Sequence, residues 1–168
     1  LSRLALTQLT PEDSAELVER ALGASDLPPE LQKLIARKAE GNPFFIEEVT
    51  RSLIETGALL ESGEGFGLGT AVADIRIPNT IHEVILARID RLDPKGREAI
   101  QLASVIGREF TVRLLNRISD LEERLTDSLD ELKKLELIYE SGYQPELAYM
   151  FKHALTHDVA YSTLLIER

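Results

Sequence analysis

The chain has 168 residues, of which 43% are hydrophobic and 29% charged, and its formal net charge is -10. This composition is globular and excludes a disordered or collagenous chain, and no apolar run approaches the roughly 20 residues that a membrane helix needs. The chain contains no cysteine, which excludes disulfides, thiolate metal sites and cysteine nucleophiles.

The first residues, Leu1-Ser2-Arg3-Leu4, include no initiator methionine and lack the regions of a signal peptide. We therefore expect a piece of a longer, cytoplasmic protein. The acidic charge is spread through both halves of the chain and repels a phosphate backbone, which disfavours nucleic acid as a partner.

The first 57 residues are predicted to form a helical bundle. Thr10-Pro11-Glu12-Asp13 reads as an N-cap followed by proline and acids, which predicts a helix that ends at Gly23. A second helix is expected from near Pro29. Gly41-Asn42-Pro43 is predicted to end it and to start a third helix, which stops at Gly57.

Residues 58–77 differ in composition and are predicted to form a floppy, glycine-rich hairpin or linker. Its strands are expected at Ala58–Glu61 and Asp74–Ile77, and Pro78 is expected to mark a boundary. A phosphate-binding loop would need a following lysine and a helix, and no helix is expected before Thr80.

The second half, residues 78–168, is predicted to be a winged-helix domain. Thr80-x-x-Glu83 and Ser119-x-x-Glu122 are capping boxes, and leucines at helical spacing follow the second one. Two short strands are expected at Leu137–Glu140 and Leu147–Phe151, and a last helix begins near His153. The fold class is thus mainly α, with one small β-hairpin in the second domain.

Few side chains in this sequence form a pattern typical of a metal, catalytic or DNA-binding site. His153 and His157 have the i, i+4 spacing of metal ligands, but no third ligand is identifiable, so no metal site is predicted. The pair Glu47-Glu48 is expected to lie on a solvated helix face. Residues 120–136, which include the helix that would read DNA, hold seven acidic and three basic side chains, a net charge of -4.

One string is similar to a known family. Gly41-Asn42-Pro43-Phe44-Phe45-x-Glu47-Glu48 resembles the end of the helical lid in predicted ATPases of the STAND class, which are relatives of AAA+ proteins used in signalling. The closer resemblance is to the ATPase module that follows adenylate/guanylate cyclase domains in large bacterial regulators. Further strings agree, in order along the chain: Ile77-Pro78-x-Thr80-Ile81, Ala87-Arg88-Ile89-Asp90-Arg91-Leu92, Ala103-Ser104-Val105-Ile106-Gly107 with Phe110, and Phe151-Lys152-His153-Ala154-Leu155 with Val159-Ala160-Tyr161.

The resemblance implies a division of the chain. Residues 1–57 would be the lid, residues 58–77 a linker and residues 78–168 the winged helix. A P-loop core would precede the chain and helical repeats would follow it, as partners in cis. Pro43 falls on the position whose proline packs against adenine, and His153 falls near the position of a histidine that senses the ADP phosphates.

The expected function is therefore non-catalytic and regulatory. No Walker motif is present in the chain, so no cofactor is expected in these residues alone, whereas the parent protein would bind ATP or ADP with magnesium. The nucleotide state would bias a conformational equilibrium. Two alternatives remain: a winged-helix DNA-binding regulator, and a helical adaptor that binds proteins.

Overall fold

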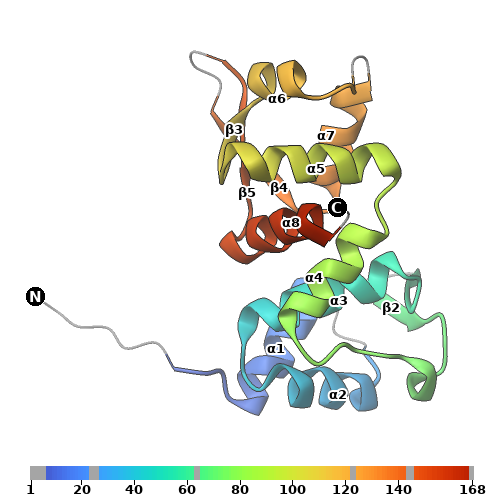
Figure 1. Cartoon of the computed structure of the whole chain (residues 1–168). Coiled ribbons are helices and arrows are strands. Elements are labelled where there is room, and N and C mark those ends of the chain that lie inside the picture. Colours follow the sequence, from blue (N-terminus) through green and yellow to red (C-terminus); the bar gives the residue numbers. More distant parts are fainter. Residues whose placement is uncertain (1–6, 23–26, 63–64, 122–123, 143–145, 167–168) are drawn as a thin grey trace, which may run out of the picture. The chain divides into compact units, whose positions relative to one another are not determined.

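The computed structural model describes residues 7–22, 27–62, 65–121, 124–142 and 146–166. Most of them are helical, with a few short antiparallel strands, which confirms the predicted fold class (Figure 1). The chain divides into two compact units, Leu1–Val84 and Ile85–Arg168.

The first unit contains the three predicted helices, α1 (Pro11–Leu22), α2 (Pro29–Ala39) and α3 (Pro43–Glu55). Each begins at a proline, whose fixed φ and missing N–H suit the first helical position. The three helices pack against one another pairwise. Their shared core consists mainly of aliphatic side chains, including Val18, Leu31, Ile35, Ile46 and Val49.

The hairpin of the first unit differs from the prediction. β1 (Leu59–Ser62) pairs antiparallel with β2 (Gly65–Leu68). The prediction that the return strand lies at Asp74–Ile77 is therefore wrong. Closing a short loop costs less chain entropy than closing a long one, which favours the nearer segment. A 3-10 helix, η1 (Val72–Asp74), stands near the expected strand instead.

The segment expected to be a linker contributes to the core of the first unit. Leu59 is 1% exposed and Ile77 is 9% exposed, and both belong to the same hydrophobic cluster as the three helices. The first unit therefore extends to Val84, beyond the expected boundary at Pro78.

The helix α4 (Ile81–Asp90) runs across the division between the units. Its start follows the predicted capping box: the Glu83 amide donates to Thr80 Oγ1 at 3.2 Å. The Glu83 carboxylate in turn accepts the Asn79 amide at 3.0 Å, one residue before the expected partner.

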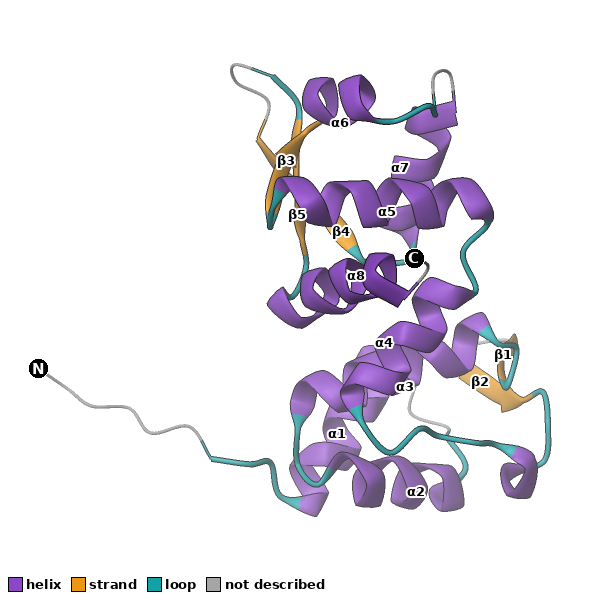
Figure 2. Ribbon diagram, viewed as in Figure 1, coloured by secondary structure: helices purple, strands orange, loops and turns teal. Residues whose placement is uncertain are grey.

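The second unit combines helices with three short strands. After α4 come α5 (Pro94–Ile106), β3 (Glu109–Thr111), α6 (Val112–Ile118), α7 (Leu125–Lys134), β4 (Ile138–Gly142), β5 (Ala148–Phe151) and α8 (Ala154–Ile166). The three strands form one antiparallel sheet in the order β3-β5-β4, with helices packed around it (Figure 2).

Two details of the second unit were not predicted. β3 is a third strand, and its Phe110 packs on Tyr149 and Phe151 of β5. α7 begins at Leu125 rather than just after Ser119, and the predicted capping residue Glu122 lies outside the described residues. The two predicted strands are confirmed as β4 and β5.

Candidate functional site

The turn that joins α2 to α3 is built by three consecutive residues. Glu40 and Gly41 both have left-handed backbone, with φ of 49° and 75°, and this ends α2. The Asn42 side chain then accepts hydrogen bonds from the amides of Phe44 at 3.0 Å and Phe45 at 3.3 Å. The turn is therefore fixed by local hydrogen bonds.

A preceding segment lies directly against this turn. The Leu9 amide donates to the Gly41 carbonyl at 2.9 Å. A Cβ on Gly41 would lie only 2.5 Å from the Leu9 carbonyl oxygen, so only glycine permits this approach. A glycine at position 41 thus permits both the left-handed backbone of the turn and the close contact with Leu9.

Pro43, the first predicted nucleotide contact, is exposed at the start of α3. It borders a hollow of about 240 Å³ together with Leu9 and with α1 residues, among them Leu17 and Arg20. Ligand pockets usually measure about 300–1,000 Å³, so this hollow could hold only part of a nucleotide. Its lining is mixed: Leu9, Leu17 and Pro43 are apolar, whereas Asp13, Glu16 and Arg20 are charged.

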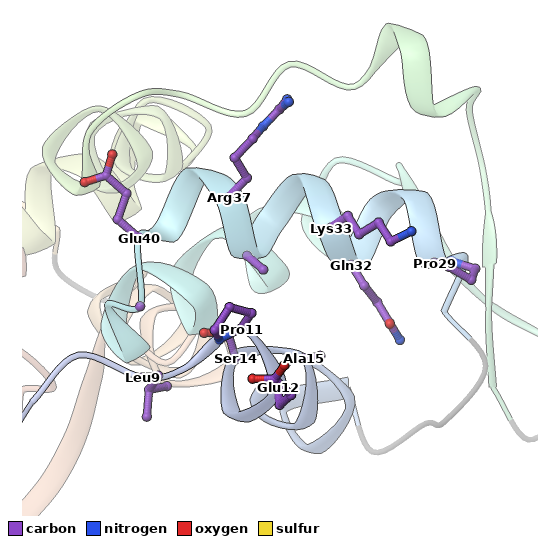
Figure 3. Close-up of a pocket in the computed structure, with 12 residues that line it drawn as sticks. Leu9, Pro11, Glu12, Ser14, Ala15, Pro29, Gln32, Lys33, Arg37 and Glu40 are labelled. Carbon is purple, nitrogen blue, oxygen red and sulfur yellow. The ribbon is translucent and has the colours of Figure 1, made fainter.

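A larger groove of about 620 Å³ lies between α1 and α2 (Figure 3). Its lining consists mainly of small or apolar side chains: Leu9, Pro11, Ser14, Ala15, Pro29, Ala36 and Gly41. Gln32 points toward α1 and donates to Glu19 at 3.2 Å, whereas Arg37 points away from α1. Leu9 borders both this groove and the hollow at Pro43.

The remaining residues of the family-like string belong largely to the core. Phe45 and Ile46 are 4% and 0% exposed. The expectation that Glu47 and Glu48 share a solvated face is wrong for Glu48, which is 2% exposed, while Glu47 is half-buried. The helix turns Glu48 toward the same side as the buried Phe45.

His153, the second predicted contact, lies in the second unit, so each predicted site residue belongs to a different compact unit. It immediately precedes α8, it is half-buried and its Nε2 atom is buried. Its carbonyl accepts the His157 amide at 3.4 Å, which closes the first helical turn.

The His157 ring is held by contacts with other residues of the second unit. Its Nε2 lies 3.0 Å from the Ser104 carbonyl oxygen of α5, its Nδ1 lies 2.9 Å from Asp158, and its ring meets Phe151 edge-on at 5.3 Å. Among the described residues, no group of three or more His, Asp or Glu side chains could hold a metal ion.

Two polar features of the second unit escaped the sequence analysis. Arg88 of α4 is 2% exposed and donates to the Leu135 carbonyl at the end of α7. Hydrogen bonds to Glu140 at 2.8 Å and to Asp130 at 3.0 Å raise the pKa of Lys133 above its ordinary value. Neither residue stood out by spacing, because each is one cation within an ordinary helical pattern.

Comparison with known families gives one match. Residues 10–60 are similar to a family described as a domain of unknown function, DUF8739. No curated protein matches the chain. The matched residues hold α1, α2 and α3, the turn at Gly41 and, apart from Leu9, every residue that lines the two hollows beside it. Within the described part of the chain, every helix is too short or too polar to cross a membrane.

Proposed function

We propose that this chain is the lid and winged-helix region of a STAND-type signalling ATPase, from a cytoplasmic bacterial regulator of the adenylate/guanylate cyclase-associated kind. The chain itself would be non-catalytic. A P-loop core before it would supply the phosphate-binding groups and magnesium, and helical repeats would follow it. The nucleotide bound by the core would bias the position of these two units.

The observation that carries this proposal is the exposure of Pro43 on a turn fixed by hydrogen bonds. The cap at Asn42 and the left-handed Gly41 hold the backbone on either side of it. Pro43 has no N–H and presents an apolar ring beside Leu9 and Leu17. Such a surface fits the face of an adenine that the core holds from its other side.

The second unit would act as the moving part of the switch. His153 stands at the start of a helix of 13 residues, where the peptide dipoles favour an anion. An imidazole there could donate a hydrogen bond to a nucleotide phosphate. In this proposal His153 distinguishes ADP from ATP, while Pro43 contacts the base shared by both.

The test uses the full-length protein and a fluorescent ADP analogue. We expect Pro43→Ala to weaken ADP binding about fivefold or more. Pro94→Ala is the matched control, because Pro94 is also an exposed proline at the first position of a helix, α5, and we expect it to bind like the wild type. A full-length protein that binds no nucleotide, or equal binding by both variants, would refute the proposal.

A second test concerns the 168-residue chain alone. It should release no more phosphate from ATP than a heat-denatured sample, because no Walker motif is present in it. Release above that background, which a P-loop core could not explain, would show that these residues are catalytic.

A further inference from the structure

The helix α6 presents two neighbouring rows of side chains to solvent. Leu114 and Ile118 are spaced i, i+4 and are 44% and 45% exposed. Arg113 and Arg117 form a second i, i+4 row one residue earlier, and both are exposed. Leu115, on another face, is fully buried and anchors the helix to the second unit.

The charge of this surface is opposite to that of the chain. Residues 108–118 hold three arginines and one glutamate, a net charge of +2, whereas the whole chain carries -10. Arg113 lies 3.0 Å from Glu146 yet keeps 83% of its side chain exposed. Arg117 forms no ion pair with any carboxylate that the structure describes.

We propose that the α6 surface, defined by Arg113, Leu114, Arg117 and Ile118, docks an acidic amphipathic helix of a partner protein. A helix with leucines in one i, i+4 row and glutamates in the adjacent row would match both rows at once. The leucines would cover Leu114 and Ile118, and the glutamates would pair with the two arginines. The aliphatic contact would supply most of the affinity and the ion pairs the orientation.

A protein helix fits this surface better than a nucleic acid duplex does. A hollow of about 430 Å³ is lined by Val112 and Asn116 of α6 and by Leu125 and Thr126 of α7, so these helices are neighbours. The segment 120–136 that contains α7 carries a net charge of -4 and would repel a duplex that reached it.

The experiment measures binding of a synthetic helical peptide that carries leucine and glutamate in adjacent i, i+4 rows. Fluorescence anisotropy reports its affinity for the full chain at low and at moderate salt. We expect the double variant Arg113→Glu/Arg117→Glu, and separately Leu114→Ser/Ile118→Ser, to bind about tenfold more weakly. Added salt should weaken wild-type binding.

Two controls distinguish docking on the α6 surface from nonspecific electrostatic or hydrophobic binding. Arg76→Glu and Leu60→Ser change an exposed arginine and a 52% exposed leucine in the first unit, and they should leave the affinity unchanged. A peptide with lysine in place of glutamate should bind less well. Unchanged thermal unfolding shows that the α6 variants are folded, as expected for solvent-facing positions.

Three results would overturn the proposal. The first is an affinity that none of the α6 substitutions changes. The second is self-association of the chain that only the α6 variants abolish, which would make a second copy the occupant. The third is a DNA duplex that binds α6 more tightly than the acidic peptide does. None of these results depends on nucleotide binding, so failure here is distinguishable from failure of the proposed function.

Discussion

Replacing Gly41 by alanine should separate two reasons for a glycine at the turn between α2 and α3. The first is backbone conformation, because Gly41 has φ of 75° and a left-handed residue with a Cβ costs about 1–2 kcal/mol. The second is contact, because the new Cβ would lie 2.5 Å from the Leu9 carbonyl oxygen. That atom is backbone, so the segment at Leu9 must move away.

Moving that segment weakens the hydrogen bond from the Leu9 amide to the Gly41 carbonyl, worth about 0.5–1.5 kcal/mol net. We therefore expect Gly41→Ala to lower the free energy of unfolding by about 2–3 kcal/mol. Gly57→Ala is the matched control. Gly57 has a similar φ of 71°, but its Cβ would meet nothing closer than Leu60 Cδ2 at 3.9 Å. The Gly57→Ala variant should lose only about 1–2 kcal/mol of its free energy of unfolding.

Urea denaturation followed by circular dichroism measures both losses, and amide hydrogen exchange localises them. The Leu9 amide should exchange faster in Gly41→Ala than in the wild type, and it should be unchanged in Gly57→Ala. Equal losses in the two variants, or a Leu9 amide that Gly41→Ala leaves protected, would refute the argument from close approach.

Three further substitutions test polar groups inside the units. Thr50→Val should keep or raise stability, because the Thr50 Oγ1 atom is buried and has no hydrogen-bond partner among the described residues; a clear loss in urea denaturation would contradict this. Arg88→Met should cost about 2 kcal/mol, since it leaves the Leu135 carbonyl without the charged donor that the buried Arg88 provides. A stability equal to wild type by the same assay would count against that role. Burial, and then the nearby Asp93, raise the pKa of Glu131 in the folded protein, so its charged form opposes folding at neutral pH. Glu131→Gln should therefore raise the free energy of unfolding at pH 7, and this gain should shrink as the pH falls through the raised pKa toward 4.5. A difference between variant and wild type that does not change with pH would refute this.

Helix starts were the most predictable part of the fold, because their signals are local. Pro11, Pro29 and Pro43 each open a helix, and Asn42 and Thr80 cap theirs through hydrogen bonds that need only residues two or three positions ahead. Such contacts do not depend on the rest of the chain, so the sequence alone is sufficient to place them.

Features that depend on distant partners were not predicted. The strand β3 has three residues and forms only because β5, almost 40 residues later, provides its hydrogen bonds. Glu48 is buried although its neighbour Glu47 is half-exposed, and a pair of adjacent acids gives no sign of this. The contact of Leu9 with Gly41 joins residues 32 positions apart, and no periodic pattern in the sequence predicts it.

The string from Gly41 to Glu48 can now be divided by what each residue does for the fold. Gly41 provides the left-handed turn, Asn42 the cap, and Phe45 a buried side chain. Pro43 differs from these, because its ring is exposed and other residues could occupy the first helical turn at a cost of about 0.4–1 kcal/mol. Pro43→Ala should therefore leave the fold almost unchanged, so that a loss of ADP binding in this variant would report on contact with the ligand and not on unfolding.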